Sequence, residues 1–250
     1  MSRIKFMNTE IDNLTMQEAL EAIDKLIREA KSAYVVTPNV DHIVQLETNK
    51  ELQDVYANAS LILTDGKPLL WIAKWYGTPI KEKISGSDLF PLLCEMAAKK
   101  GYKMFFLGAA EGIAVKAAEN LTRRYPGLNV TGTYSPPYGF EKNQKELDKI
   151  KSIIKKVKPD ILIVGLGCPK QETFMYYHCK ELEVPISLGL GASFDFEAGN
   201  IKRAPRWMAD HGLEWLFRIT QDPKRMAKRY LVDDHRIFSL ALKYKNMIGK

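Results

Sequence analysis

The sequence predicts an α/β protein, a Rossmann-like layered domain with a mainly parallel sheet, followed by a basic amphipathic helical appendage at the C-terminus. The domain is predicted by apolar, β-branched runs that alternate with amphipathic stretches and end in glycine or small polar residues. Such alternation is typical of parallel strands joined by right-handed helical crossovers. The appendage is predicted by charge. Residues 202–250 hold twelve Lys or Arg and five Asp or Glu, which accounts for the whole formal net charge of +7.

The first hundred residues predict a strand or hairpin and then alternating helices and strands. Thr15 and Glu18 form a capping box for a helix that runs to about Ala30. The continuous apolar run after it is expected to be a strand covered on both faces. In order, the expected elements are a hairpin arm at 4–12, a helix at 15–30, a strand at 33–38, a helix at 39–49, a strand at 59–65, a helix at 66–77, a loop at 78–86 and a helix at 87–101.

The second half repeats the alternation. The expected elements are a strand at 102–110, a helix at 111–124, a strand at 128–134 that enters a Pro/Tyr/Gly loop, a lysine-rich helix, a strand at 160–165, a helix, and a strand within 185–199 that ends in glycines. We therefore expect two domains, an α/β catalytic core at 1–198 and a helical basic appendage at 199–250.

Length and composition restrict the class of protein. A chain of 250 residues with 46% hydrophobic content can bury a full core. No apolar run reaches the ~18 residues that span a bilayer, and the N-terminus resembles no signal peptide, so we expect a cytoplasmic protein. The three cysteines lack CxxC spacing, which favours reduced thiols over a disulfide framework or a zinc site.

Polar residues follow two neighbouring runs of the predicted sheet. Thr37 and Asn39 end one strand and Asp65 ends the next, so parallel strands bring all three to the carboxyl edge, where open α/β sheets bind ligands. A carboxylate there is a candidate general base. Gly66 and Pro68 suit a steep turn into a helix. The alternative interpretation is that Thr37 and Asp65 are only helix N-caps.

Glycines at other strand ends raise the question of dinucleotide binding. Neither GLGCPKQE nor FFLGAAEG has the full G-x-G-x-x-G pattern, which weakens a nicotinamide-dependent oxidoreductase. The backbone N–H groups of such turns are suited to holding a diphosphate, and Gly108 in FFLGAAEG is the candidate we select. The alternative is that these glycines serve turns and packing.

The acidic residues do not predict a metal site. Asp195 and Glu197 form an acid-x-acid pair, but they alternate with phenylalanines, and the pair at 233–234 resembles a solvated helix face. The four histidines are scattered. Cys168, between a glycine and a proline, is more readily explained as an inert small residue than as a nucleophile.

Seven blocks of sequence stand out in this order: TPNVDHIV, LTDGKPL, ISGSDL, FFLGAAEG, GLGCPKQE, GASFDFEAG and RAPRWMADHGLEWLFRITQDPKRMAKRYL. Together they cover nearly the whole chain and resemble the WecG/TagA/CpsF family of bacterial glycosyltransferases. The resemblance implies an inverting enzyme that moves N-acetylmannosamine from its UDP derivative (UDP-ManNAc) to the 4-hydroxyl of N-acetylglucosamine on undecaprenyl diphosphate, for the wall teichoic acid linkage unit. It also implies that no metal or other cofactor is needed, and that the enzyme lies peripherally on the inner face of the plasma membrane.

The resemblance assigns roles to individual residues. Asp65 becomes the base, with Thr37 and Asn39 beside the sugars. Gln171 and Asp195 fall on positions associated with the nucleotide-sugar pocket. The basic positions thought to close over the diphosphates are Arg218, Arg225 and Lys228 or Arg229.

Two positions depart from the family pattern that we expect. Lys83 stands where a loop arginine is expected, so the charge stays but the planar fork that binds phosphate in a bidentate manner is lost. Cys168 replaces another small residue. The identity of the UDP-sugar stays open, since related members use other sugars such as N-acetylmannosamine uronate or glucose.

The basic appendage indicates an anionic partner. Pro223 is expected to open a long helix with an apolar stripe of Met226, Tyr230, Ile237, Ala241, Tyr244 and Ile248, widened by Ala227, Leu231, Phe238 and Leu242 and flanked by Arg225, Arg229, Arg236 and Lys243. We expect this helix to contact an anionic membrane surface. Packing on its own core or on a neighbouring subunit is the alternative. We expect a homo-oligomer, and no nucleic acid as partner, because the basic residues are confined to one terminal segment.

Overall fold

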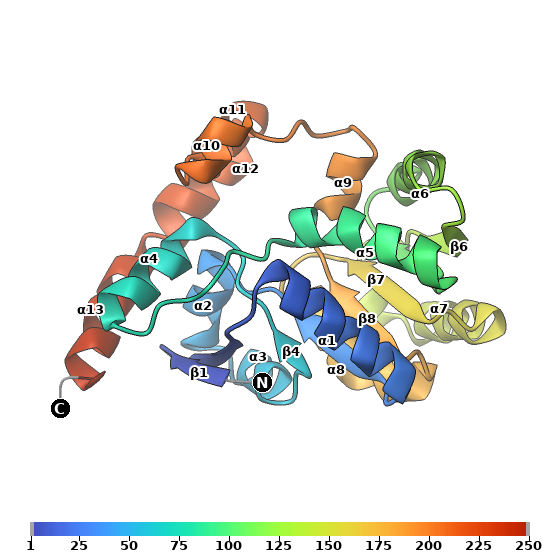
Figure 1. The fold of residues 1–250 in the computed structure, drawn as a ribbon, viewed down its shortest axis with the longest axis horizontal. Helices are drawn as coiled ribbons and strands as arrows, with labels where there is room; N and C mark the ends of the chain where they lie inside the picture. Colours follow the sequence, from blue (N-terminus) through green and yellow to red (C-terminus); the bar gives the residue numbers. More distant parts are fainter. Residues whose placement is uncertain (1–2, 249–250) are drawn as a thin grey trace.

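The computed structural model describes residues 3–248 and confirms the predicted fold class (Figure 1). Six parallel strands form one sheet in the order β4-β3-β8-β7-β5-β6, and β1 and β2 form a separate antiparallel hairpin. The strands are β1 (Arg3–Phe6), β2 (Thr9–Asp12), β3 (Ala33–Val36), β4 (Leu61–Ile62), β5 (Lys103–Gly108), β6 (Asn129–Tyr134), β7 (Ile161–Gly165) and β8 (Ile186–Gly189).

Helices connect the strands and cover both faces of the sheet (Figure 1). Those of the core are α1 (Met16–Glu29), α2 (Val40–Leu46), α3 (Lys50–Ala57), α4 (Lys67–Tyr76), α5 (Gly86–Lys100), α6 (Ile113–Arg124), the 3₁₀ turn η1 (Phe140–Lys142), α7 (Gln144–Val157), α8 (Lys170–Leu182) and α9 (Ser193–Glu197). Those of the appendage are α10 (Arg206–Asp210), α11 (Glu214–Gln221), α12 (Pro223–Ala227), the π-helical turn η2 (Lys228–Asp233) and α13 (Arg236–Ile248).

Each face of the sheet has its own hydrophobic core. Helices α1, α5 and α6 pack on one face, and α2, α3, α7 and α8 pack on the other. The central strands β7 and β8 are buried almost throughout, as expected of strands covered on both sides. The predicted capping box at Thr15 and Glu18 is present. The core therefore follows from the apolar runs, and it fixes the strand ends that carry the polar residues.

Two segments differ from the prediction. Residues 50–57, which we did not assign, form α3, because Asn49 ends the preceding helical stretch and caps a new helix through Leu52 N–H. The segment Ser193–Glu197, expected within a strand, is the short helix α9. The strand ends at Gly189, and the left-handed Gly191 turns the chain away from the sheet.

The appendage does not form the long helix that we expected. Its backbone widens into a π turn at η2, where Asp234 N–H donates to the Arg229 carbonyl, and a turn at residues 234–235 separates η2 from α13. Part of the predicted stripe, Met226, Ile237 and Ala241, is buried. The helix α13 lies beside α4 and α2 of its own core (Figure 1), so the predicted alternative of intramolecular packing holds for that stripe.

Three of the residues that were expected to widen the apolar stripe face the solvent. Leu231, Phe238 and Leu242 are exposed, and Phe238 keeps 79% of its surface in solvent. Over residues 3–248, no helix has the length and apolar character needed to cross a membrane. The appendage therefore combines a buried apolar side on the core with an exposed apolar side.

Candidate active site

A cavity of about 1110 Å³ opens at the carboxyl edge of the sheet, between the core and the appendage. Strand ends supply its floor, and α4, α9, α11 and the η2 region supply its walls. Nine residues singled out from the sequence line it: Thr37, Asn39, Asp65, Lys83, Gln171, Asp195, Arg218, Arg225 and Arg229. Segments far apart in the chain are therefore brought to one place, as the parallel topology requires.

Thr37 and Asp65 are not N-caps, contrary to the alternative interpretation. Thr37 donates from its hydroxyl to the Gly189 carbonyl at 3.1 Å, which ties the ends of β3 and β8 together. The N-cap of α2 is Asn39, and that of α4 is Gly66, which has no side chain to cap with. Among the side chains that the structure describes, which leave out those at positions 1–2, 206, 210 and 248–250, none hydrogen-bonds to the Asp65 carboxylate. That carboxylate is therefore available to a ligand.

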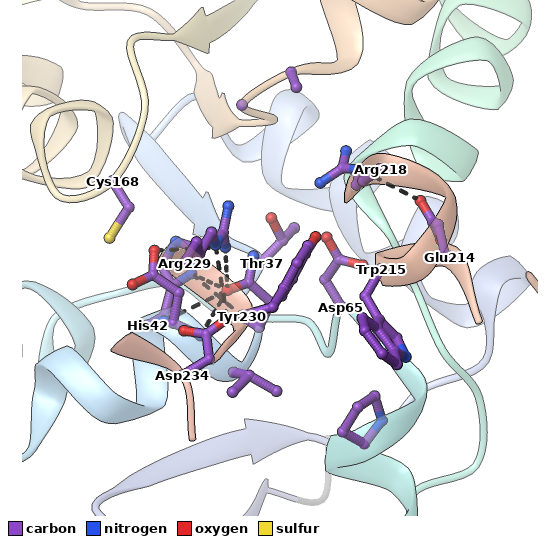
Figure 2. A pocket seen from close by; sticks show the side chains of 18 of the residues that line it. Thr37, His42, Asp65, Cys168, Glu214, Trp215, Arg218, Arg229, Tyr230 and Asp234 are labelled. Atoms are coloured by element: carbon purple, nitrogen blue, oxygen red, sulfur yellow. Dashed lines mark hydrogen bonds and ion pairs between the residues drawn. The ribbon is translucent and has the colours of Figure 1, made fainter. Parts of the chain in front are cut away.

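Asp65 points into the cavity, with Tyr230 and Trp215 of the appendage nearby (Figure 2). Withdrawal from bulk water and the negative charge of Glu214 raise the pKa of Asp65 to about 6, although Lys83 and Arg218 act in the opposite direction. A carboxylate with a pKa just below neutrality is ionised at pH 7 and is also a stronger base than an ordinary aspartate. The environment of Asp65 is therefore suited to proton abstraction.

Arg218 enters the cavity from α11. Its guanidinium lies 5.2 Å from the ring centroid of Phe196 on α9, and its Nε lies 3.9 Å from Glu214 Oε1 (Figure 2). A guanidinium that stacks on an aromatic ring is held in place while its N–H groups stay available as hydrogen-bond donors. Arg218 thus joins the appendage to the core and keeps donors for an anionic ligand.

Lys83 lies in the loop before α5 and shares an acid with the appendage linker. Its Nζ is 3.1 Å from Asp88 Oδ2, while Arg203 Nη1 is 3.2 Å from Asp88 Oδ1. Burial opposes the charge on Lys83, but Asp88, Asp65 and Glu214 raise its pKa, so it is a cation. The predicted loop cation is present at the cavity, although its Asp88 partner is already engaged.

Gln171 and Asp195 come from the ends of the central strands. Gln171 Oε1 accepts from Gly191 N–H at 3.2 Å, and its Nε2 donates to Glu172 at 2.8 Å. Asp195 Oδ1 accepts from Asn200 Nδ2 at 2.9 Å. Both side chains line the cavity, with Gln171 held by the turn after β8 and Asp195 by the residues that follow α9.

The predicted basic residues of η2 and α12 differ in how they lie relative to the cavity. Arg229 turns inward, donating to Asn39 Oδ1 at 3.1 Å and lying 3.4 Å from Asp41. Arg225 lines the cavity, but its side chain is 68% exposed and pairs with Asp222. Lys228 is exposed and does not line the cavity. Of the two alternatives, Lys228 or Arg229, the geometry favours Arg229.

Gly108 also lies outside the lining. A side chain there would meet the backbone of Gly165 at 2.4 Å, because the two strand ends approach closely, and its φ is +114°. Close strand packing and the left-handed turn explain this glycine without a ligand, which was the alternative interpretation. The structure gives its predicted diphosphate contact no support.

Several residues of the site were not anticipated. Glu214, Trp215 and Tyr230 line the cavity, and beneath it His42 on α2 lies 3.1 Å from Glu172 on α8. The order of elements in space was needed to bring these groups together. One local signal existed, since Glu172 follows Gln171 directly in PKQE.

The acidic pairs considered for a metal have other partners. Glu197 pairs with Arg124 at 2.8 Å. Residues 193–197 form a helix and not a strand, so the side chains of Asp195 and Glu197, two positions apart, point in different directions. Ligand-type atoms of Asp41, His42 and Cys168 lie within 4.8 Å of one another. Both ring nitrogens of His42 already face oxygen acceptors, so this cluster is a hydrogen-bond network and does not fit a metal.

Comparison with known proteins agrees with this geometry. The family model described as "Glycosyl transferase WecG/TagA/CpsF family" matches residues 4–249. A relative in Bacillus spizizenii (strain ATCC 23059 / NRRL B-14472 / W23) is 30% identical over 251 residues, covering 100% of this chain and 93% of the relative. It is named N-acetylglucosaminyldiphosphoundecaprenol N-acetyl-beta-D-mannosaminyltransferase.

Two further relatives carry the same name. The protein of Bacillus subtilis (strain 168) is 28% identical over 222 residues, which is 89% of this chain and 83% of the relative. That of Staphylococcus aureus (strain MW2) is 27% identical over 229 residues, which is 91% of this chain and 88% of the relative. The similarity thus spans both the core and the appendage.

Proposed function

Because the chain belongs to the WecG/TagA/CpsF family of glycosyl transferases, we propose that it transfers N-acetylmannosamine from UDP-ManNAc to N-acetylglucosamine on undecaprenyl diphosphate. The names of three relatives support this acceptor and this sugar. The observation in the structure that carries the proposal is Asp65, a carboxylate with a raised pKa and no hydrogen bond from any side chain that the structure describes, in a cavity with Lys83 and Arg218. The product belongs to the wall teichoic acid linkage unit.

The chemistry assigns each group a step. The 4-hydroxyl oxygen of the acceptor attacks the anomeric carbon from the face opposite the UDP, the bond from that carbon to the β-phosphate oxygen breaks, and the anomeric centre inverts. The attacking hydroxyl becomes acidic as the new bond forms, and Asp65 takes its proton. A positioned base of this kind contributes roughly 10²–10⁴-fold to the rate.

Fixed cations serve the leaving group. Negative charge grows on the β-phosphate as UDP departs, and Lys83 and Arg218 supply positive charge within the same cavity. Preorganised charges in a site shielded from water stabilise such a transition state without reorganisation. The enzyme therefore needs no metal or other cofactor, and Arg229 and Arg225 extend the cationic wall.

The exposed side of the appendage supports a contact with the membrane that holds the acceptor. Leu231, Phe238 and Leu242 supply apolar surface, and Arg236 is an exposed cation beside them. An interfacial helix gains about 1 kcal/mol per basic residue near an anionic surface, in addition to its apolar burial. The protein thus acts at the inner face of the plasma membrane, through a face different from the stripe that packs on the core.

The decisive experiment mixes the purified protein with UDP-ManNAc and a lipid diphosphate that carries N-acetylglucosamine. We expect release of UDP and a lipid product heavier by one N-acetylhexosamine, both detected by mass spectrometry. Parallel reactions with UDP-N-acetylmannosamine uronate and UDP-glucose test the alternative donors of the same family. Absence of transfer with every donor, from a protein shown to be folded, would reject the proposed activity.

A further inference from the structure

Asn39 has an unusual set of hydrogen-bond partners. Its Oδ1 lies 3.1 Å from the Asp41 backbone nitrogen, 3.1 Å from Arg229 Nη2 and 2.9 Å from His42 Nδ1. An amide N–H and a guanidinium can only donate, so the atom that faces them is the oxygen of the Asn39 amide. The Nδ2 group of Asn39 is therefore directed to the other side, where Asn39 lines the cavity.

His42 is held from its other end by Glu172. His42 Nε2 lies 3.1 Å from Glu172 Oε1, and Gln171 Nε2 donates to that same oxygen at 2.8 Å. Gln171 cannot reverse its amide freely, because its own oxygen accepts from Gly191 N–H. The Glu172 oxygen therefore remains an acceptor, so His42 must donate from Nε2. His42 Nδ1 lies 3.4 Å from the Asn39 backbone nitrogen and 2.9 Å from Asn39 Oδ1, and the shorter contact, to an oxygen that can only accept, favours Nδ1 as a donor.

From this geometry we infer that the buried pair His42–Glu172 positions the Asn39 amide, so that its N–H groups face the cavity and hydrogen-bond an oxygen of the bound donor sugar. The inference rests on the proposed function, since it takes the sugar of UDP-ManNAc as the ligand of Asn39. His42 and Glu172 are positioning residues, because they act through Asn39. Arg229, from the appendage, also donates to Asn39 Oδ1. Docking of the appendage and binding of the sugar therefore both depend on the Asn39 amide.

The charge of His42 agrees with its two donated bonds. Burial would lower the pKa of His42, but Cys168 and Glu172 raise it well above its usual value. Burial also raises the pKa of the Cys168 thiol. Of these two side chains, Glu172 is the carboxylate in direct contact with the ring, with its Oε1 3.1 Å from His42 Nε2. With the charge of Glu172 removed, His42 would hold its second proton only at lower pH.

Other groups around His42 contribute to its charge balance. Those that face it from the surrounding elements are Asp41 on α2, Tyr56 on α3, Asp65 after β4, Cys168 before α8, Arg229 in η2 and Asp234 after η2. The pair Asp41–Arg229 is internally neutral, and Asp234 lies 3.7 Å from the same guanidinium. Glu172 is the carboxylate that contacts the His42 ring itself, at Nε2.

The test is Glu172→Gln, which keeps the shape and the accepting oxygen but removes the charge. Above the usual pKa of histidine near 6.5, the neutral ring keeps its Nε2 proton for that oxygen and turns a bare Nδ1 towards Asn39 Oδ1. We compare kcat/KM for UDP-ManNAc in the variant with that in the unchanged protein, as a ratio. We expect this ratio to be about 0.1 at pH 8 and to return towards one by pH 5.5.

The matched control is Glu181→Gln on the same helix, where a half-exposed carboxylate pairs with Lys151. It removes an equal charge from α8 and should leave the ratio near one at every pH. A loss in Glu172→Gln that is the same from pH 5.5 to 8 would assign Glu172 a packing role and overturn the inference. So would a ratio near one throughout.

A second measurement needs no variant of Glu172. Nitrogen-15 spectra of the imidazole rings should show His42 with both nitrogens protonated at pH 7.5, assigned by replacing each of His178, His211 and His235 with Gln. A bare ring nitrogen in His42 at that pH would overturn the inference even if Glu172→Gln failed to fold. Failure of the proposed function would be seen separately, as absence of sugar transfer by the unchanged protein. The His42 spectrum would still show whether His42 donates to both Asn39 and Glu172.

Discussion

The hydroxyl of Tyr76 donates to the backbone carbonyl of Ala241 at 2.8 Å and so joins the end of α4 to the middle of α13. Tyr244 and Lys243 reach Glu47 at the end of α2, with Tyr244 Oη 3.0 Å from Glu47 Oε2. The appendage is thus held on two core helices by one apolar stripe and a few polar bonds. Among the residues that the structure describes, the core on the other face of the sheet, under α1, α5 and α6, contains none from the appendage.

Removing the chain from Gly199 onward tests whether the core folds and binds UDP without the appendage. We expect the remaining core to fold and to bind UDP, with a lower melting temperature because the surface around Tyr76 becomes exposed. Transfer to a lipid-linked acceptor and binding to anionic liposomes should both be lost. Activity assays, liposome sedimentation and thermal unfolding measure these effects, and full activity in the truncated protein would contradict them.

Substitutions on the exposed side separate membrane contact from docking. Leu242→Ser with Met247→Ser removes exposed apolar surface of α13 that lines neither the core nor the cavity, so the fold and UDP binding should be unchanged. We expect liposome binding to weaken several-fold and to weaken further with salt. Leu216→Ser, at an exposed leucine of α11, is the control. Equal liposome binding by both variants and the unchanged protein would exclude this face.

Asp65→Asn is nearly isosteric and cannot act as a base. Turnover should fall by at least ~10²-fold, while UDP affinity stays within a few-fold. Asp88→Asn is a useful comparison, since it alters the Lys83 environment without touching the base. Near-normal turnover in Asp65→Asn, measured as UDP release, would remove Asp65 from the mechanism.

The pH dependence follows from the raised pKa of Asp65, about 6. The base must be ionised, so kcat should rise ~10-fold per pH unit below 6 and level off above it. Because the folded state holds this proton more tightly than the unfolded chain, ionised Asp65 destabilises the fold above pH 6. Asp65→Asn should therefore raise the melting temperature at pH 8, and the gain should shrink as the pH falls through 6. A flat rate profile between pH 5 and 7 would count against this assignment.

Activity should persist in excess chelator, because Lys83 and Arg218 provide the positive charge opposite the leaving diphosphate. The measurement is the initial rate in EDTA compared with the rate in added Mg²⁺ or Mn²⁺. A rate that disappears in EDTA and returns with either ion would reject metal independence, and Asp195 would be the first residue to substitute.

Much of the site was predictable because it lies at strand ends. The pattern of a β-branched run followed by Asp-Gly-x-Pro identified Asp65, and parallel topology placed it beside Thr37 and Asn39. The pair His42–Glu172 was not predictable, since its members are 130 positions apart and each looks locally like a helix residue. Proximity of that kind depends on how α2 and α8 pack on one face of the sheet.

The path of the appendage was predicted only in part. Periodicity from Met226 to Ala241 indicated one helix, and both residues are indeed buried. The π turn at η2 and the turn at residues 234–235 divide the predicted helix but leave the apolar spacing nearly unchanged, so a pattern count does not detect them. The inward position of Arg229 is held by its contacts with Asn39 and Asp41, which the helical pattern alone does not indicate.

The position of β8 determines when this protein can mature during translation. It is the last strand to leave the ribosome, yet it lies between β3 and β7. The strands β3 and β4, and separately β5 to β7, must wait with unpaired inner edges until Gly189 has been synthesised. Exposed strand edges of this kind are vulnerable to aggregation, so nascent chains stalled before β8 should depend on chaperones more than finished ones do.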